Sequence, residues 1–129
     1  MPWTWQPGKT TCPPVSSELH QWDVVKVRIN PEDRDEHPAV IISPEELCAD
    51  PRKTKLNVLY GTTRRPGEIP RPHDVVLNGA DGLEHQTLVG CAYFYGVDRR
   101  KITGSMGRVA LERRRQIGRK IVASYRLPL

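Results

Sequence analysis

The chain has 129 residues, 27% of them charged and 6% aromatic, a composition typical of one domain with an ordinary hydrophobic core. No apolar run approaches the ~18 residues that a transmembrane helix needs, and the first residues lack the apolar stretch of a signal peptide. We therefore expect a cytoplasmic protein that is not inserted in a membrane. Cys12, Cys48 and Cys91 are far apart and show no metal-ligand spacing, which predicts reduced thiols and neither a disulfide framework nor a metal site.

Positive charge is concentrated at the C-terminal end. The net charge is +5, but residues 99–129 carry +9, with Glu112 as their only acid, whereas residues 1–98 carry −4. A segment this basic favours a polyanion or an acidic protein as partner. The alternative is a helix whose charges only keep the protein in solution.

The first elements are an irregular arm and a strand. Residues 1–19 contain four prolines among Ser, Thr and Gly, so we expect a loose arm followed by a single domain over residues 20–129. From Gln21 the sequence W-D-V-V-K-V-R-I alternates with a period of two. This pattern predicts a half-buried strand with Lys26 and Arg28 on its solvent face.

Two short apolar runs follow, each beside a residue able to do chemistry. Residues 39–42 and 58–60 are rich in β-branched and aromatic side chains, which predicts two buried strands. His37 lies just before the first run and Thr62 just after the second. If the two strands pair, these residues lie on one rim of a small β structure. Between the strands, the sequence S-P-E-E at residues 43–46 predicts a short helix with the serine as its N-cap.

The middle of the chain combines a basic loop with further strands. Residues 63–73 are rich in proline and include Arg64 and Arg65, which predicts a mobile, basic loop next to Thr62. Strands are predicted at residues 74–77, 87–89, 91–95 and 97–102, with a turn at 78–82. Tyr93 and Tyr95 alternate with a phenylalanine in one of these strands, so they should share a face.

The last element is a helix over residues 110–125, stopped by Pro128. Its apolar side chains gather mostly on one side, and its three consecutive arginines, residues 113–115, cannot all lie on one face. At least one of them must lean toward a partner, a phosphate or the protein itself. Strands followed by one helix, without βαβ alternation, predict a mainly β fold: a small SH3-like antiparallel barrel with a C-terminal helix.

Several of these segments occur in a familiar order. They are the strand W-D-V-V-K-V-R-I, the run H-P-A-V-I-I-S from His37, a strand ending in Thr62, Gly82-Leu83, Val97-Asp98 and the C-terminal helix. In this order and spacing, residues 21–127 resemble the MazF/PemK toxins of bacterial toxin–antitoxin systems. The resemblance implies an SH3-like barrel that forms homodimers, and endoribonuclease activity on single-stranded RNA without metal or other cofactor. It also implies inhibition by an acidic antitoxin protein.

Two positions depart from what the resemblance implies. The family usually has arginine before its Pro-Ala strand, where this chain has His37, whereas the threonine at position 62 matches. The family's glutamine and arginine on a later strand are replaced by Tyr93 and Tyr95. Both a divergent nuclease and a relative that kept the fold and lost the reaction are consistent with these changes.

The residues themselves suit metal-independent RNA cleavage, in which the 2′-hydroxyl attacks the adjacent phosphorus. His37 is suited to carry a proton near neutral pH, and the Thr62 hydroxyl can donate a hydrogen bond to a phosphate oxygen. Arg64 or Arg65 would place a positive charge next to the phosphate, and Arg28 is also predicted to bind the RNA. Tyr93 and Tyr95 could stack unpaired bases, at ~1–3 kcal/mol per base.

Each assignment has an alternative. His37 could be a surface histidine, Thr62 could simply end a strand, and the two tyrosines could belong to a core or a dimer interface. The chain as a whole could then be a catalytically inactive SH3-like module that binds nucleic acid or an acidic protein, or a scaffold whose basic helix is an assembly surface. Binding that weakens with salt and shows no turnover would indicate the inactive module.

Overall fold

A computed structural model describes residues 18–28, 32 and 36–128. Most of the predicted N-terminal arm lies outside these residues, and so does Ile29 of the first predicted strand. Of the arm, Leu19 is described, and it is buried in a hydrophobic cluster with Val25 and Val27. Leu19, the last residue of the predicted arm, therefore packs on the core.

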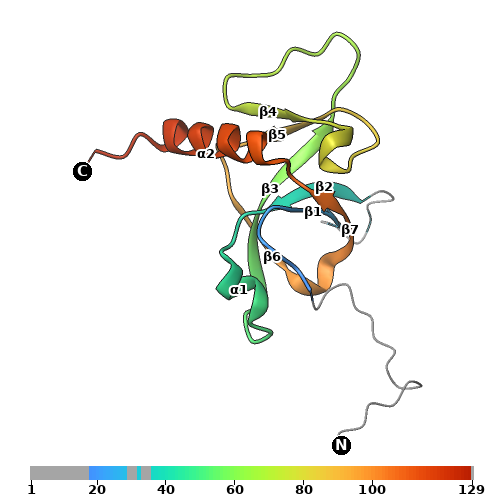
Figure 1. The fold of residues 1–129 in the computed structure, drawn as a ribbon, viewed down its shortest axis with the longest axis vertical. Coiled ribbons are helices and arrows are strands. Elements are labelled where there is room, and N and C mark those ends of the chain that lie inside the picture. The colour runs from blue at the N-terminus through green and yellow to red at the C-terminus, as the bar shows by residue number, and fades with distance from the viewer. Residues whose placement is uncertain (1–17, 29–31, 33–35, 129) are drawn as a thin grey trace, which may run out of the picture.

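The described residues form one antiparallel sheet of seven strands, with two α-helices (Figure 1). The strands are β1 (Asp23–Val27), β2 (His37–Ile41), β3 (Lys55–Thr63), β4 (Asp74–Leu77), β5 (Thr87–Gly90), β6 (Tyr95–Asp98) and β7 (Ile102–Arg108). The helices are α1 (Glu45–Ala49) and α2 (Leu111–Tyr125), and the 3-10 turns η3 (Gly79–Asp81) and η4 (Arg99–Lys101) complete the set. Along the sheet the order is β4-β5-β3-β2-β1-β7, and β6 also pairs with β3.

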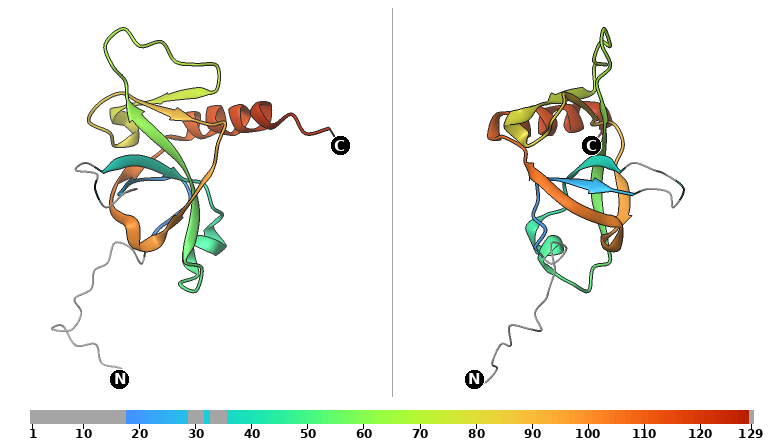
Figure 2. Two further views of the ribbon diagram at one scale, coloured as in Figure 1. Left: turned by 180° about the vertical axis from the view of Figure 1, so that it is seen from behind. Right: turned by 90° about the vertical axis from the view of Figure 1, so that its right-hand side faces the viewer.

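The long strand β3 connects two parts of the sheet. Its first half pairs with β6 from Lys55 to Val58, and its last three residues pair with β5. On the opposite edge, β2 pairs only with residues Val58 to Tyr60 of β3. Consequently β2 and β3 separate after Tyr60, and β3 continues alone beside β5. In Figures 1 and 2, β4 and β5 lie with α2 on one side of the curled strands, and α1 lies on the other.

Apolar side chains are buried on both faces of this sheet. For this reason β1 contains more apolar residues than a strand that has one face in solvent. Val25 and Val27 of β1 belong to one cluster, with Ile41, Leu56 and Val58. Val24, on the alternate face, belongs to a second cluster, with Val40, Leu59, Leu77 and Ile117 of α2. Of the predicted solvent-facing residues, Lys26 is exposed and Arg28 is half-buried.

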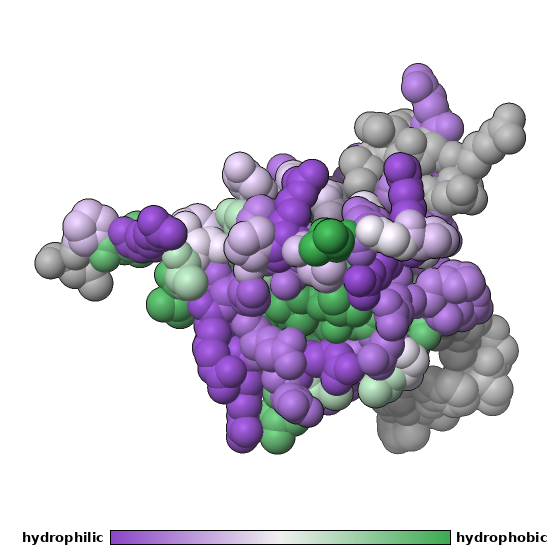
Figure 3. Space-filling model, turned by 90° about the horizontal axis from the view of Figure 1, so that it is seen from above, coloured by the Kyte–Doolittle hydropathy of each residue, from purple (hydrophilic) through white to green (hydrophobic). Residues whose placement is uncertain are grey.

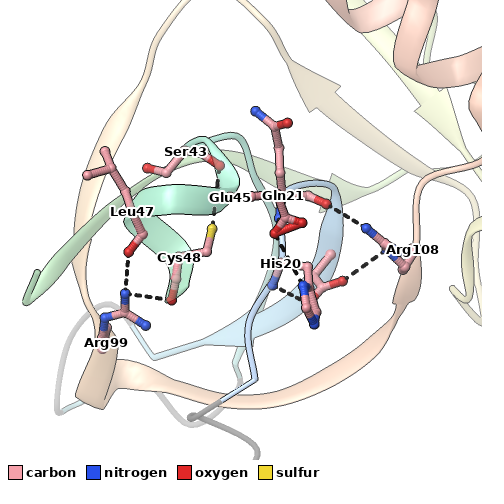
Figure 4. Close-up of polar contacts among 9 residues, drawn as sticks. His20, Gln21, Ser43, Glu45, Leu47, Cys48, Arg99 and Arg108 are labelled. Carbon is pink, nitrogen blue, oxygen red and sulfur yellow. Dashed lines mark hydrogen bonds and ion pairs between the residues drawn. The ribbon is translucent and has the colours of Figure 1, made fainter. Parts of the chain in front are cut away.

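A guanidinium holds α1 against the turn between β6 and β7. Arg99 of η4 donates hydrogen bonds to the carbonyl oxygens of Leu47 (2.6 Å) and Cys48 (2.8 Å) (Figure 4). It also donates to the carbonyl oxygen of Asp50 (3.0 Å). The carbonyl groups at a helix C-terminus have no partner within the helix, so a cation there is favourable. At the other end of α1 the N-cap prediction is wrong by one residue. Pro44 occupies the N-cap, and the Ser43 hydroxyl accepts a hydrogen bond from the Asn57 N–H (2.8 Å).

The buried carboxylate of Asp81 joins η3 to α2. It accepts hydrogen bonds from the backbone N–H of Asn78 (3.0 Å) and of Ala110 (2.7 Å), and pairs with Arg113 Nε (3.2 Å). Arg113 is thus one arginine of the run 113–115 that leans into the protein, as the helical geometry requires of at least one of them, and Arg114 is another, since its Nε donates to the Val109 carbonyl oxygen (2.7 Å). The buried pair sets the position of α2 over β4.

The mainly β fold with a C-terminal helix is confirmed, with differences at three places. Among the described strands β6 and β7 do not pair, so the curled sheet is not closed into a barrel. The predicted strand 97–102 ends at Asp98, and the predicted turn T-G-S-M-G lies inside β7. Helix α2 buries only Ile117 fully, whereas Leu111, Val122 and Tyr125, predicted on the apolar side, are exposed.

Candidate functional site

His37 and Thr62 lie at the point where β2 and β3 part. The last paired residues are Ala39 and Tyr60, and extending this register by two residues brings His37 opposite Thr62. Side chains two residues apart on a strand share a face. His37 therefore projects on the same side as Ala39, and Thr62 on the same side as Tyr60. His37 is half-buried and Thr62 is exposed. Both predicted rim residues thus lie just beyond the end of the β2–β3 ladder, and their action on one phosphate stays a prediction.

Two basic positions lie at the same rim, at the end of β1. Val27 pairs with His37, so Arg28, the next residue, follows directly at this edge. Arg28 is half-buried, and its backbone N–H donates to the carbonyl oxygen of Lys101 (3.2 Å). Lys26 pairs with Pro38 and is exposed. The β1 end therefore adds positive charge near the rim, with Lys26 on the face opposite to the imidazole.

Arg64 and Arg65 follow β3 but differ in their contacts. The Arg64 guanidinium donates to the carbonyl oxygen of Glu68 (2.9 Å) and to the side chain of Gln86 (3.1 Å), and its backbone N–H donates to the Gln86 carbonyl (2.8 Å). Arg64 therefore fastens the start of the loop 64–73 to the segment before β5. Arg65 is exposed; its backbone N–H donates to Glu68 Oε1 (2.9 Å), and its carbonyl oxygen accepts from the Glu68 N–H (3.0 Å). Of the two, Arg65 is the better placed to meet an anion.

Tyr60, on the same strand as Thr62, forms an aromatic pair with Tyr95 of β6. The rings of Tyr60 and Tyr95 have centroids 4.5 Å apart and planes inclined at 35°. Burial raises the pKa of Tyr60, and the neighbouring Tyr95 hydroxyl raises it further. Tyr60 was not among the predicted site residues, although its position two residues before Thr62 was a usable signal, because alternation places both on one face.

The argument that placed Tyr93 and Tyr95 on one face is wrong. It assumed a strand over residues 91–95, but residues 91–94 lie between β5 and β6 and belong to neither strand. Tyr93 is 68% exposed in this break, whereas Tyr95 is the first residue of β6 and stacks on Tyr60. Phe94, between them, stacks on Tyr125 of α2 with centroids 5.6 Å apart.

A small cavity of about 170 Å³ opens beside the parting strands. Its walls include Glu36 and Thr63, the chain neighbours of His37 and Thr62. Within the part of the chain that the structure describes, no three His, Cys, Asp or Glu side chains are grouped to hold a metal ion. Nor does any helix of that part have the length and apolarity to cross a membrane.

The family profile of the PemK-like, MazF-like toxins of type II toxin–antitoxin systems matches residues 20–125. The chain belongs to this family. A sequence comparison with curated proteins finds no significant match. The predicted family relationship is therefore confirmed by the profile match over residues 20–125, which leaves the Pro-rich arm outside.

Solved structures of toxins share the fold at low sequence identity. The Mycobacterium tuberculosis toxin MazF-mt6 is 16% identical with a TM-score of 0.67, over 83% of this chain and 99% of that one. MazE-MazF from Deinococcus radiodurans gives 13% identity and a TM-score of 0.67, over 85% and 97% of the two chains. An endoribonuclease in complex with its cognate antitoxin, from a mycobacterial species, gives 14% and 0.66, over 86% and 96%. At such identities the likeness shows that the PemK/MazF-like chain has the toxin fold.

Proposed function

We propose that this PemK/MazF-like chain is the toxin of a type II toxin–antitoxin pair and cleaves single-stranded RNA without a metal ion. The observation that carries the proposal is the pairing of β2 and β3, whose last pair, Ala39 and Tyr60, lies two residues from His37 on one strand and two residues from Thr62 on the other. Family membership supports it, and so do the solved relatives, one of which is an endoribonuclease in complex with its cognate antitoxin.

In the reaction, the 2′-oxygen of the substrate forms a bond to phosphorus and the bond to the 5′-oxygen breaks. The products are a 2′,3′-cyclic phosphate and a 5′-hydroxyl. His37 takes the proton of the 2′-hydroxyl, or supplies the proton that the leaving 5′-oxygen needs. The Thr62 hydroxyl donates a hydrogen bond to a phosphate oxygen, and Arg65 and Arg28 neutralise the charge that gathers on the phosphate. Arg64 acts mainly by fixing the loop that carries Arg65.

The tyrosine pair provides a surface for bases beyond the reacting phosphate. Tyr95 is 44% exposed and already stacked against Tyr60, so an unpaired base can add to the pair without first ordering it. Tyr93, more exposed and outside any strand, can contribute a second stacking face. This arrangement also suits the alternative function, in which the chain binds RNA and does not cleave it.

Cleavage assays with matched variants test the proposal. Purified protein with single-stranded RNA and EDTA should give discrete fragments, and His37→Ala or Thr62→Ala should lower the rate about 10²–10⁴-fold. His73→Ala and Thr54→Ala change the same residue types outside the rim and should leave the rate unchanged. His37→Arg restores the residue usual in the family and should retain activity. RNA that is bound but stays intact with the wild-type protein would favour the inactive module.

We also propose that the toxin is a homodimer. Phe94 (40% exposed) and Tyr125 stack on each other at the surface, and the neighbouring Val122 of α2 is 76% exposed. Contiguous exposed apolar side chains of this kind are typical of protein interfaces. A second copy of the chain would cover them.

The antitoxin is proposed to be an acidic protein that binds the basic part of the chain. Arg115 and Arg119 are exposed on α2. Seen from above, the side of the molecule on which α2 lies is largely hydrophilic, with a hydrophobic area between the charged groups (Figure 3). Such a face suits an acidic segment that also carries apolar anchors. Co-expression with the acidic protein encoded by a neighbouring short reading frame should relieve growth inhibition, and Arg115→Glu with Arg119→Glu should prevent that relief.

A further inference from the structure

The cavity beside the rim has walls from five separate segments of the chain. It is lined by Lys26, Glu36, Pro38, Thr63, Leu83, Glu84, His85 and Met106. Its volume of about 170 Å³ exceeds that of a single water, which occupies about 30 Å³ in the liquid, several times over. A planar ring system of the size of a nucleobase is the kind of group that such a space admits.

The loop that closes the cavity is held by its own contacts, so the cavity is formed before any ligand arrives. Gly82 has φ +92° and packs directly against the backbone of Met106 and Gly107. At the other end of the loop, the Thr87 hydroxyl donates to the carbonyl oxygen of His85 (3.1 Å), and the Gln86 carbonyl accepts from Arg64 N–H (2.8 Å). A preformed cavity loses little conformational entropy when it binds a ligand.

The polar groups of the cavity favour a base over a phosphate. Two carboxylates, Glu36 and Glu84, face one ammonium, Lys26, and the imidazole of His85. With two anions in its wall the cavity repels a phosphate, whereas carboxylate oxygens accept hydrogen bonds from the N–H groups of a base. Leu83, Met106 and Pro38 supply apolar surface for the ring.

The cavity lies where a neighbouring nucleotide would reach it. Side chains alternate along a strand, so Pro38 and Thr63 of the cavity wall project on the face opposite to His37 and Thr62. Because β2 and β3 no longer pair at these residues, the two faces meet at the open rim. An RNA chain with its phosphate at His37 and Thr62 can therefore turn the next base around this rim into the cavity.

We propose that this cavity binds a guanine base next to the cleaved phosphodiester, with Glu36 reading its Watson–Crick edge. Guanine is the base that presents two adjacent donors there, N1–H and N2–H₂, and a carboxylate can accept both in parallel. Glu36 is half-buried and next to His37, whereas Glu84 is exposed, so Glu36 is the better-shielded acceptor. The assignment rests on the proposed RNA substrate and names the base that the same site prefers.

The test uses hexanucleotides with 2′-deoxyribose throughout, which can bind but cannot be cleaved by 2′-hydroxyl attack. One guanosine is moved through the six positions, and at the best position it is replaced by inosine, which lacks N2–H₂, or by 1-methylguanosine, which lacks N1–H. Fluorescence anisotropy should show each replacement weakening binding about tenfold, because each removes a hydrogen bond to a charged group. A 7-deazaguanosine probe keeps the Watson–Crick edge and should bind like guanosine.

Variants connect this preference to the cavity. Glu36→Gln should reduce the difference between guanosine and inosine to about twofold or less, since the amide cannot accept two hydrogen bonds through two oxygens. Glu46→Gln, an exposed glutamate on α1, should keep the full difference. Thermal unfolding of each variant checks that the fold is retained. If Glu36→Gln does not fold, the comparison of probes on the wild-type protein still tests the guanine preference.

Binding and cleavage are measured separately, so failure of the guanine assignment can be distinguished from failure of the proposed cleavage. Equal binding of guanosine, inosine and 1-methylguanosine probes, or no measurable binding of any probe, would overturn the guanine assignment, even if ribose RNA is still cut. Conversely, a clear guanine preference in binding together with intact ribose RNA would support the cavity assignment and rule out the nuclease activity.

Discussion

The Asp81 carboxylate shows how a single residue can hold several segments together. It has no exposed surface, and its oxygens are used by two backbone N–H groups and by Arg113. Removing one partner of a buried ion pair leaves the other charge without compensation, which costs more than the pair contributes. The contact fixes α2 and the start of the loop that closes the cavity.

We therefore expect Arg113→Ala to lower the free energy of unfolding by roughly 3 kcal/mol. Arg115→Ala, two residues away on the same helix and exposed, should change it by no more than about 0.5 kcal/mol. Urea unfolding followed by circular dichroism measures both. Equal effects of the two variants would show that the Asp81–Arg113 pair does not stabilise the fold.

The thiol of Cys91 is expected to be unreactive. Burial raises the pKa of Cys91 from 9.0 to about 11, with the Asp74 carboxylate adding to the shift. Because the thiolate is the reactive form, its population at pH 8 falls about 100-fold, and it recovers only as the pH rises toward the shifted pKa. Iodoacetamide labelling resolved by peptide mass spectrometry should show Cys91 at least 100-fold slower in the native protein than in urea. A native rate near that in urea would contradict both the burial and the pKa shift.

At the scale of secondary-structure elements, the closing loop depends on a glycine that an L-residue cannot replace. Gly82 follows η3 with φ +92°, and a Cβ added there would fall on the carbonyl oxygen of Met106 in β7. The element therefore needs glycine for two reasons, a left-handed backbone and a close approach of two chain segments.

Gly82→Ala should destabilise the protein by about 2 kcal/mol or more, because the strained φ and the clash act together. Gly118→Ala is the matched control: no atom lies within 4 Å of its added Cβ, and it stands inside α2. There alanine should stabilise the protein by about 0.5–1 kcal/mol. Melting temperatures that fall for Gly82→Ala and rise for Gly118→Ala would confirm the difference, whereas two similar shifts would refute it.

At the scale of the whole molecule, the proposed homodimer depends on the exposed aromatic stack of Phe94 and Tyr125. Phe94→Glu places a charge in the proposed interface and should convert the dimer into a monomer at micromolar concentration, as measured by sedimentation equilibrium. Ile69→Glu changes a side chain that is 82% exposed in the loop 64–73 and should leave the dimer intact. A wild-type protein that is already monomeric would rule out the homodimer.

Much of the architecture could be read from local patterns. Alternation from Val24 to Val27, the apolar runs that became β2 and β3, and the 3.6-residue period of α2 each depend on neighbours along the chain. The predictions that failed involved competition between distant segments. The expected strand over residues 91–95 breaks because β5 and β6 pair with different parts of β3. The expected turn T-G-S-M-G became strand because β1 pairs with it.

The sequence by itself determined the elements, the family and the two residues that flank the apolar runs, since these follow from side-chain periodicity and order along the chain. Only the tertiary structure decided that β2 and β3 part after Ala39 and Tyr60, so that His37 and Thr62 lie beyond the end of their ladder, and that a cavity opens beside them. It also decided that Tyr60 stacks on Tyr95 and that Arg64 is used within its own loop. The physical reason is that strand register and loop contacts arise from pairing between residues far apart in the chain, and no local pattern specifies that pairing.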